Sequence, residues 1–544
     1  MSRPNPFILT AFLLAVVTIL GGLPLLQGAL FIGKHEGDMM HLLDIVFRIA
    51  DGQWPHRDFM TPIGYLAFAP IALFVKLGYG VGHAILYSQV LVAAILLPVT
   101  VWVAVTRIPG RWAYLFGFVV MVFCLALVHG EAERSISISM HYNRWAWAVS
   151  FLVLTAALLP ARGRARAAVD GPIIGLGLAA LALTKITFFA GFAVPVALAL
   201  AIRRDWRALR LAVFAGLAVV AVVTLLAGPL YWPAYIRDLL TVAGSELRPS
   251  PGGVSFRAMI GAPAFVGGNL LLIYAAILLR EMRHDLLGLV VLLLVPGFYF
   301  VTHQNYGNDP KWLLLLGILL FISRTPGAAP PEKGIDRNQV ALVVGTALLA
   351  FIFPSLVNMT LSPLRQGNTV VSEYAPLLGG EAPHDDLFAA KSRAYLIRKQ
   401  APVDMRDGGL DRFSDMVERP EPAQLLGEEL PDCELYTGLI GWYANVAADL
   451  EEAGYAGARF FNADVLNPYW LFADFRPLAH GAPWHYDGLP GIEGADYLVV
   501  PVCPVKQKQR KRILDLIAET PLELHEAHRT DHYILLELDG QAGG

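Results

Sequence analysis

The chain has 544 residues, of which 56% are hydrophobic and only 16% are charged. A soluble protein of this size carries about 25% charged residues, so the composition argues against a wholly soluble protein, and the high apolar and aromatic content argues against a disordered one. The net charge is −3. This argues against a nucleic-acid-binding protein, because such a protein needs a basic face to contact phosphates. The composition therefore indicates a polytopic membrane protein with one soluble part.

The first apolar run extends from Phe7 to Ile32, after a short N-terminus that carries Arg3. It is long enough to span a bilayer core of about 30 Å. It is also longer than the core of a signal peptide and lacks a clear A-x-A cleavage site. We expect an uncleaved transmembrane helix that enters from the cytoplasm, with a secretory signal as the alternative.

Ten further apolar segments follow along the first two thirds of the chain. They centre near residues 83–106, 112–129, 145–160, 171–186, 187–202, 209–230, 258–280, 285–302, 310–323 and 338–357. Segment 62–77 is also apolar but is shorter, and it contains Pro62, Gly64 and Pro70.

The basic loops decide whether segment 62–77 crosses the membrane. The densest are 162–166 and 203–210, and weaker clusters lie at 107–111, 280–283 and 324–337. All five share the side of Arg3 only if segment 62–77 does not cross, which the positive-inside rule favours. We therefore expect about eleven spanning helices, a cytoplasmic N-terminus, and a re-entrant or interfacial helix at 62–77.

The outer side then receives four loops and the C-terminal part of the chain. In a bacterial inner membrane this side is the periplasm. The loops are 33–82, 130–144, 231–257 and 303–311.

The composition changes after Leu361, where charged residues become frequent. We expect a transmembrane domain over residues 1–358 and a soluble periplasmic α/β domain over 359–544, with a partly extended linker near 361–422. Within this domain the pattern predicts helices at 435–453 and 506–519 and strands at 458–461, 497–502 and 533–538. The sequence of this domain contains neither a G-x-G-x-x-G nor a P-loop pattern, so it gives no support for nucleotide binding.

The sequence contains three cysteines. Cys124 lies in a predicted membrane helix, where packing explains it. Cys433 and Cys503 lie in the C-terminal domain and could pair in an oxidising compartment. Their separation in space is not readable from the sequence, so the pairing stays open.

Two carboxylates follow the first predicted membrane helix directly. They are Glu36 and Asp38 in the segment K-H-E-G-D-M-M-H. The helical spacing of apolar residues from Met40 to Ala50 predicts an amphipathic helix on the membrane surface, with Asp38 at its N-terminus and His41 one turn on. The structural alternative is that Asp38 is only an N-cap and Glu36 a solvated loop charge.

The same loop continues with G-x-x-P-x-x-D-F at 52–59 and P-x-G-Y-L at 62–66. With the preceding acids, it resembles the first outer loop of GT-C-type glycosyltransferases, polytopic enzymes similar to protein mannosyltransferases and aminoarabinose transferases. The resemblance covers roughly residues 1–360, and its specific part is 31–66. It implies a polyprenyl-phosphate sugar donor used on the outer face, and an inverting transfer in which a first-loop acid activates the acceptor hydroxyl. Here Gly37 separates the two acids, so it stays open whether Glu36 and Asp38 hold a divalent cation, Mg²⁺ or Mn²⁺.

The residue chemistry agrees with such a reaction. Glycosyl transfer needs a carboxylate near the reacting centre, and the departing phosphate needs positive charge or a metal. Arginine can grip a phosphate in bidentate fashion, whereas lysine acts as a point charge. Asp38 and Glu36 are the expected catalytic residues. The expected substrate- and phosphate-binding residues are His41, Arg57, Asp58, Glu131, His141, Asn143, Arg144, Lys185, His303, Asn305 and Lys311.

Several of these residues also have structural explanations. Arg144 and Lys185 could snorkel to the membrane interface. Residues 302–312 could form a solvated turn between helices, and the loop 231–257 is long enough to act as a flexible lid.

Three functions are compatible with this pattern. The leading hypothesis is a membrane glycosyltransferase that moves a sugar from a polyprenyl phosphate to a glycan, lipid or protein acceptor of the cell envelope. A transporter or lipid flippase is the second, although the predicted helix centres hold few ionisable residues and no internal repeat is evident. The third is a non-catalytic envelope-assembly subunit whose outer domain binds a partner.

Overall fold

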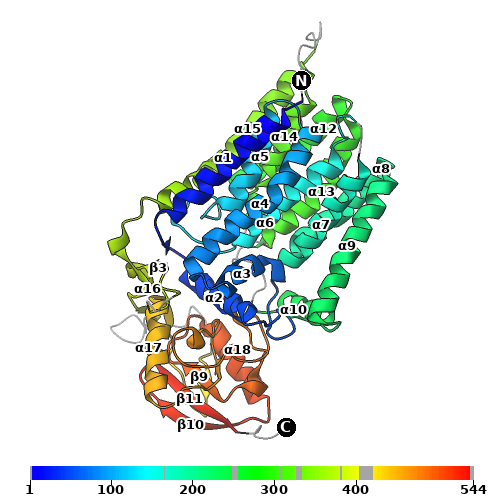
Figure 1. The fold of residues 1–544 in the computed structure, drawn as a ribbon. Coiled ribbons are helices and arrows are strands. Elements are labelled where there is room, and N and C mark those ends of the chain that lie inside the picture. The colour runs from blue at the N-terminus through cyan, green and yellow to red at the C-terminus, as the bar shows by residue number, and fades with distance from the viewer. Residues whose placement is uncertain are drawn as a thin grey trace, which may run out of the picture. The chain divides into compact units, whose positions relative to one another are not determined.

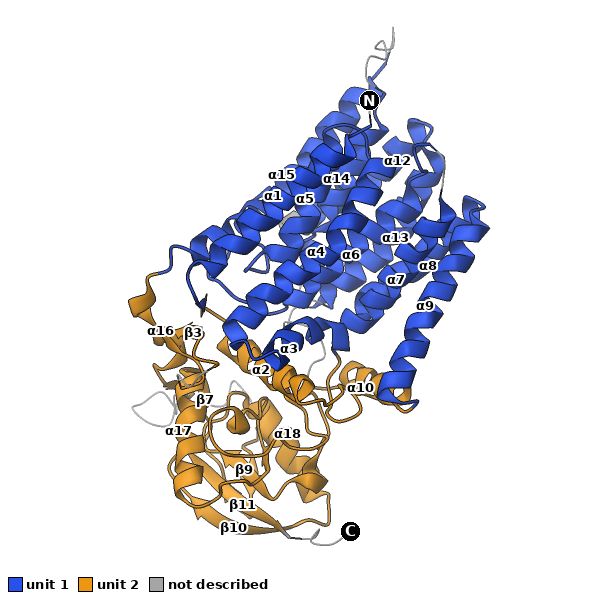
Figure 2. Ribbon diagram, in the orientation of Figure 1, with its two compact units in different colours: residues 1–30, 63–229, 250–369 blue, residues 31–62, 230–249, 370–544 orange. Residues whose placement is uncertain are grey.

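The computed structural model describes residues 3–163, 166–247, 255–304, 309–325, 334–379, 383–402 and 421–539. The chain forms two compact units, each assembled from three separate stretches (Figure 2). Unit 1 comprises residues 1–30, 63–229 and 250–369, and unit 2 comprises residues 31–62, 230–249 and 370–544. The predicted boundary between residues 358 and 359 differs from this division, because two of the predicted outer loops belong with the C-terminal residues.

Unit 1 is a bundle of apolar helices that lie side by side (Figure 1). Within the residues that the structure describes, six of them are long and apolar enough to cross a membrane: α1 (Pro6–Leu25), α4 (Val81–Arg107), α7 (Ala167–Thr184), α9 (Trp206–Ala227), α13 (Asp285–His303) and α15 (Arg337–Gln366). Three shorter apolar helices are α5 (Trp112–Leu125), α8 (Ile186–Ile202) and α14 (Trp312–Ser323). The remaining long helices are α6 (His141–Leu158) and α12 (Pro263–Glu281), and the short α11 (Phe256–Gly261) precedes α12. These helices support a membrane-embedded protein, and the number of eleven spans stays a prediction.

Segment 62–77 forms no spanning helix. It contains a single turn at Tyr65–Ala67 and the eight-residue helix α3 (Ala69–Lys76). At 1.5 Å per residue, α3 is about 12 Å long, far less than a bilayer core. Gly64 precedes this turn, and a Cβ atom there would lie 2.1 Å from the carbonyl oxygen of Leu183. Only glycine permits this close approach to the end of α7.

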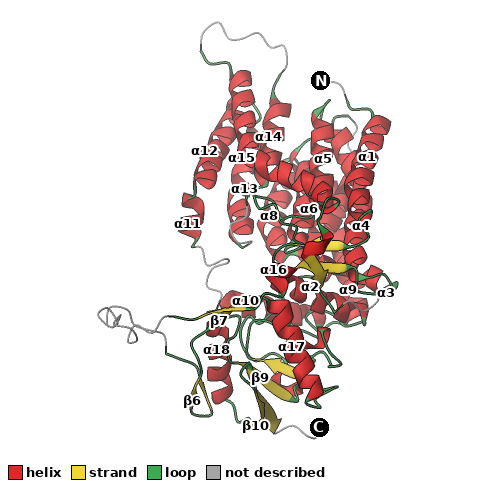
Figure 3. Ribbon diagram, turned by 90° about the vertical axis from the view of Figure 1, so that its left-hand side faces the viewer, coloured by secondary structure: helices red, strands yellow, loops and turns green. Residues whose placement is uncertain are grey.

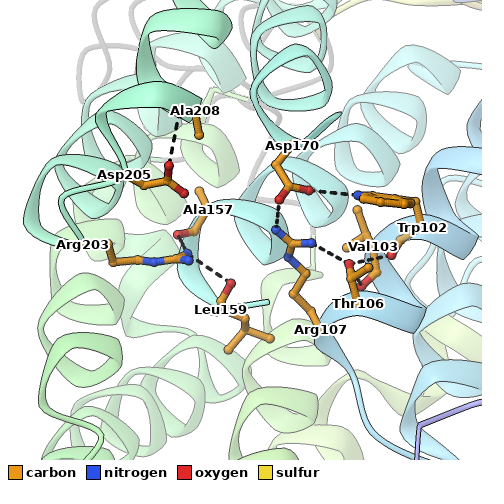
Figure 4. Close-up of polar contacts among 10 residues, drawn as sticks. All are labelled: Trp102, Val103, Thr106, Arg107, Ala157, Leu159, Asp170, Arg203, Asp205 and Ala208. Carbon is orange, nitrogen blue, oxygen red and sulfur yellow. Dashed lines mark hydrogen bonds and ion pairs between the residues drawn. The ribbon is translucent and has the colours of Figure 1, made fainter. Parts of the chain in front are cut away.

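The basic loops of unit 1 carry structural contacts as well as charge (Figure 4). Arg107, at the end of α4, forms a buried ion pair with Asp170 of α7, with 2.6 Å between Nη2 and Oδ2. Arg203 donates through Nη1 to the carbonyl oxygens of Ala157 and Leu159, at 2.7 and 3.1 Å, and so caps the end of α6. These arginines therefore join helix ends, a structural role that is separate from the topology predicted from their charge.

Two contacts place the start of the chain at this same end of the bundle. The amide of Arg162 donates to the carbonyl oxygen of Thr106 at 2.7 Å. A Cβ atom at Gly163 would lie 2.0 Å from the guanidinium of Arg3. The loops that begin near residues 107, 162 and 203 thus gather near Arg3, as expected if segment 62–77 does not cross.

Unit 2 combines two helices from the predicted outer loops with an α/β region. The helices are α2 (Glu36–Ala50) and α10 (Tyr231–Gly244). The α/β region has a four-stranded sheet in the order β10-β11-β9-β8, made of β8 (Phe460–Asn462), β9 (Tyr497–Pro501), β10 (Glu523–Arg529) and β11 (Tyr533–Asp539), with α17 (Leu439–Glu452) and α18 (Gln507–Ala518) (Figure 3). Strands β8 and β9 are parallel and the other pairs are antiparallel. Alternate residues of β9 and β11, such as Leu498, Val500 and Leu536, pack with Ile513 and Ile517 of α18 in the core.

Smaller elements of unit 2 fall within the stretch expected to be a linker. They include β2 (Tyr374–Pro376), β3 (Leu387–Ala390), α16 (Lys391–Ala394) and β4 (Arg398–Gln400). The short β1 (Leu30–Ile32) joins β2 and β3 in the sheet order β1-β3-β2. Two-residue strands β5 (Gln424–Leu425) and β6 (Glu428–Glu429) pair with each other. The expected linker is therefore structured over much of its described length.

The strand β7 (Glu434–Thr437) occupies the start of the predicted helix 435–453, so the helix begins only at Leu439. This strand pairs with β4. Immediately before it, Cys433 forms a disulfide with Cys503, across a sequence separation of 70 residues. The pairing that the sequence left open is present, and Cys124 is a buried free cysteine in α5.

Candidate functional site

The two first-loop acids lie in the first turn of α2 in unit 2. Glu36 is buried, and Nη2 of Arg393 lies 3.2 and 3.4 Å from its two carboxylate oxygens. Asp38 is half-buried on the same turn. The N-cap position is His35, whose side chain makes no capping bond. Both structural alternatives are therefore wrong, because Asp38 is not the N-cap and Glu36 is not a solvated charge.

The middle of α2 is tied to the C-terminal region by a second polar cluster. Asp44 accepts bonds from Arg48 at 2.5 Å and from the indole nitrogen of Trp470 at 2.7 Å. Burial raises the pKa of Asp44, and both bonds oppose that rise. The ring of His41 lies 5.6 Å from the ring of Trp484. The predicted helix is confirmed, but the consecutive residues from Met39 to Val46 are all buried, so α2 is enclosed on more than its apolar face.

Arg57 and Asp58 of the G-x-x-P-x-x-D-F motif form a turn. The Asp58 carboxylate accepts the amide of Trp54 at 2.6 Å and the guanidinium of Arg57 at 2.9 Å. Partial burial works to raise the pKa of Asp58, but these bonds outweigh it and hold the pKa below its ordinary value. The Arg57 side chain is exposed and already bonded to its neighbour, so this pair has a structural role in the turn.

Lys311 and the Glu131 segment come together in unit 1. The Lys311 side chain is buried and its Nζ lies 2.5 Å from Oδ1 of Asp309. A Cβ atom at Gly130 would lie 3.0 Å from that same Nζ. The neighbouring amide of Glu131 donates to Ser355 of α15 at 3.1 Å. A solvated turn is therefore the wrong reading for Lys311, although Glu131 itself is exposed.

Asn358, one turn further along α15, secures the same segment. Its amide nitrogen donates to the carbonyl oxygens of Gly130, Glu131 and Glu133 at 2.8 to 3.0 Å. Arg365 in turn donates to the side-chain oxygen of Asn358 at 2.6 Å. These contacts fix the backbone beside Lys311. The sequence did not predict them, because no pattern in the residues of α15 indicates a contact with residues 130–133.

Arg144 caps the end of α5. Its two terminal nitrogens donate to the carbonyl oxygens of Ala126 at 2.5 Å and Val128 at 3.0 Å. A cation at a helix C-terminus satisfies carbonyl groups that have no partner within the helix. The side chain is fully buried, so it does not snorkel, and its terminal nitrogens are engaged with the backbone rather than available for a bidentate phosphate contact.

The residues before Arg144 are also buried. Nε2 of His141 lies 2.8 Å from the carbonyl oxygen of Ala67. Both polar atoms of the Asn143 amide are buried without a hydrogen-bond partner in the described part of the chain. A buried amide without partners is costly unless a ligand or water supplies them.

Lys185 lies between α7 and α8, with its ammonium 5.6 Å from the ring centre of Tyr142. It is half-buried, and a cation over an aromatic face is a stabilising arrangement. His303 ends α13, and its ring lies 5.5 Å from that of Phe256. Asn305 lies outside the described residues.

The predicted site residues thus divide between the two units. Unit 2 holds the acids with His41, Arg57 and Asp58, and unit 1 holds the others that the structure describes. Among the described residues, no group of three or more His, Cys, Asp or Glu side chains is suited to a metal ion. Comparisons with protein families, with curated proteins and with solved structures found no match.

Proposed function

We propose that this chain is an inverting membrane glycosyltransferase that transfers a sugar from a polyprenyl phosphate to a cell-envelope acceptor. The observation that carries the proposal is the state of the two acids in the first turn of α2, which ten residues separate from the end of the first apolar helix. Glu36 is engaged by Arg393, and Asp38 lies on the same turn, where it is half-buried. The proposal gives the two carboxylates different roles.

In this proposal Asp38 is the base that accepts the proton of the acceptor hydroxyl. A carboxylate in the first turn of a helix faces backbone amides, which stabilise its charged form. Glu36 and Arg393 position this turn. The ion pair already gives Glu36 a cationic partner, so the two acids do not fit a divalent-metal site, and no step of the proposal uses a metal.

The departing polyprenyl phosphate gains negative charge as its bond to the sugar breaks, and that charge needs a cation. Lysine suits this role as a compact point charge.

We further propose a bacterial inner-membrane location, with the N-terminus in the cytoplasm and the α/β region in the periplasm. Two observations support this orientation. The basic loops near residues 107, 162 and 203 lie close to Arg3, as the positive-inside rule predicts for a cytoplasmic end. The Cys433–Cys503 disulfide suits an oxidising compartment.

The test uses the full chain in proteoliposomes with polyprenyl phosphates that carry glucose, mannose, galactose or arabinose. An envelope extract from a strain that lacks the protein supplies the acceptor, and mass spectrometry measures released polyprenyl phosphate. A general base contributes about 10²–10⁴-fold to a rate, so Asp38→Asn should lower turnover at least 100-fold.

Asp51→Asn is the matched control. It changes an exposed acid just after the last residue of the same helix and should leave turnover unchanged. Equal turnover by Asp38→Asn and the unaltered chain would remove Asp38 from the mechanism. Movement of the donor across the bilayer without release of polyprenyl phosphate would instead indicate a flippase.

A further inference from the structure

The first part of the loop that the sequence suggested as a lid is a helix. α10 covers the 14 residues Tyr231–Gly244 and belongs to unit 2. At 1.5 Å per residue it is about 21 Å long, which is too short to cross a bilayer core. Its two faces differ from those of the other helices in unit 2 and indicate a role at the membrane surface.

One face of α10 packs on the first outer loop. Tyr231, Tyr235 and Asp238 are at most 3% exposed. Oδ2 of Asp238 lies 3.0 Å from Nδ1 of His56 and accepts the amide of Thr61 at 3.2 Å. The ring of Tyr235 stacks on the ring of His56, with 4.2 Å between the ring centres. These contacts fix the orientation of α10 on the loop, and the sequence did not predict them because 182 residues separate His56 from Asp238.

The opposite face of α10 is both exposed and apolar. Ile236 and Leu240 are 57% and 66% exposed, and Pro233 and Ala243 are exposed beside them. Steps of three and four residues place these four side chains on one side of the helix, about half a turn from the buried residues. A helix on the surface of a soluble domain ordinarily exposes polar residues instead.

α17 shows that ordinary pattern within the same unit. It buries Tyr443 and Leu450 and exposes Asn445, Asp449 and Glu452. Polar side chains on the exposed face of α17 can bond to water. The apolar face of α10 offers no such groups, and a contiguous apolar surface of this kind marks a contact with a partner or a membrane.

The charges of α10 suit a lipid surface. The side chain of Arg237, beside the apolar face, is 71% exposed. The one acidic residue in the helix sequence, Asp238, is buried on the opposite side. Helices that lie on membranes combine apolar residues with exposed basic residues in this way, because the basic residues attract lipid phosphates.

Chain connectivity also brings α10 to the membrane. α9 is long and apolar enough to span a bilayer, and only 6% of its apolar window is buried within the protein. A three-residue link joins the two helices, so Tyr231 lies within about 14 Å of Ala227. Leu225, Leu226 and Leu230 are 84%, 65% and 72% exposed. Exposed apolar residues therefore continue along the chain from the end of α9 into α10.

We propose that α10 lies in the head-group layer of a phospholipid bilayer, with the apolar face of Pro233, Ile236, Leu240 and Ala243 toward the acyl chains. Through Asp238, the helix then holds the first outer loop at the membrane surface. The inference requires that α9 spans the bilayer, and it does not depend on the proposed glycosyl transfer.

The test measures the depth of nitroxide spin labels by electron paramagnetic resonance. The full chain is placed in nanodiscs that hold one chain each, in a bilayer of phosphatidylethanolamine and phosphatidylglycerol. Ile236→Cys and Leu240→Cys are labelled one at a time in a Cys124→Ala background, which keeps the Cys433–Cys503 disulfide. Oxygen concentrates in lipid and a neutral nickel chelate stays in water, so the ratio of their collision rates with the label reports its depth.

Two reference labels bracket the expected result. Ala448→Cys is the matched control, because it lies on the exposed face of α17 in the same unit. Leu217→Cys, at a residue of α9 that is 57% exposed, gives the value for the lipid interior. The ratio of oxygen to nickel collisions at residues 236 and 240 should be several-fold higher than at residue 448 and lower than at residue 217, since an interfacial helix is buried by about 5–10 Å.

Either of two results would overturn the proposal. A ratio at residues 236 and 240 equal to that at residue 448 would show that the face lies in water. Loss of collisions with both reagents would show that a protein surface covers the face. The thermal unfolding temperature of each variant reports whether it is folded, and either label tests the proposal if the other variant unfolds. The readout does not involve sugar transfer, so failure of the transfer hypothesis would leave it intact.

Discussion

Loss of the Cys433–Cys503 disulfide is expected to destabilise the C-terminal region of unit 2 by about 4 kcal/mol. The bridge spans 70 residues of sequence. A cross-link that closes a loop of that length restricts the unfolded chain, which raises its free energy by roughly 4 kcal/mol in the chain-entropy treatment. The double change Cys433→Ser with Cys503→Ser removes this restriction. For a typical urea dependence of about 2 kcal/mol per molar, the unfolding midpoint should fall by about 2 M.

The assay is urea unfolding of the full chain in detergent, followed by pulse proteolysis and detection of C-terminal fragments. Cys124→Ala is the control, because it removes the buried free cysteine of α5 in unit 1, and it should leave the C-terminal midpoint unchanged. A loss below about 1 kcal/mol in the double variant would refute the loop-entropy argument. Alkylation of both thiols in intact cells, before lysis, would refute the periplasmic orientation.

Two other predictions concern buried charge. Asp170→Asn leaves the buried guanidinium of Arg107 without its carboxylate and should lower the free energy of unfolding by about 3–5 kcal/mol. Arg337→Gln breaks the exposed pair with Glu281 and should lower it by at most about 1 kcal/mol. Equal shifts in the thermal unfolding temperature of the two variants would contradict this difference. Burial raises the pKa of Asp464 to about 7, above its value of about 4 in an unfolded chain. Its neutral form therefore stabilises the fold most below pH 4, and this contribution falls by up to about 4 kcal/mol as the pH rises to 7. The difference in unfolding free energy between the unaltered chain and Asp464→Asn should decline over that range, and a constant difference would show that the carboxyl does not titrate there.

Local sequence patterns predicted much of the helical architecture. The apolar runs predicted most helices of unit 1 to within about five residues, because length and hydropathy are read directly from the chain. The exceptions are α1, which ends at Leu25 rather than Ile32, and α15, which continues to Gln366 rather than residue 357. The strands β9 and β11 were predicted for a similar reason, since each is a short apolar run. Strand β10 was missed because five of the seven residues Glu523–Arg529 are charged or polar, and only Leu524 and Ala527 are apolar.

Long-range partners were beyond the reach of the sequence pattern. Glu36 is separated from Arg393 by 357 residues, and His56 from Asp238 by 182. Each of these side chains taken alone looks like an ordinary loop charge. Motif reasoning found the acids on α2 but could not show that one of them is already paired.

The prediction also failed where a residue's role depends on a neighbouring helix end. Arg144 was expected at a phosphate or at the membrane interface, but the carbonyl groups at the end of α5 engage it. The sequence contains no marker for such a cap. The same limit applies to β7, where pairing with β4 overrides the helical pattern of the residues that follow.

Unit 2 is built from an early, a middle and a late stretch of the chain, and this has a consequence for biosynthesis. Residues 31–62 leave the ribosome long before residue 370, the start of the third stretch. At about 5–20 residues per second, the interval between them is on the order of 15–60 s. During that time Glu36 and Asp44 have been translated, while Arg393 and Trp470 have not. The newly synthesised loop therefore stays without Arg393 and Trp470 during this interval. An assembly factor or a quality-control protease would have access to it at that time.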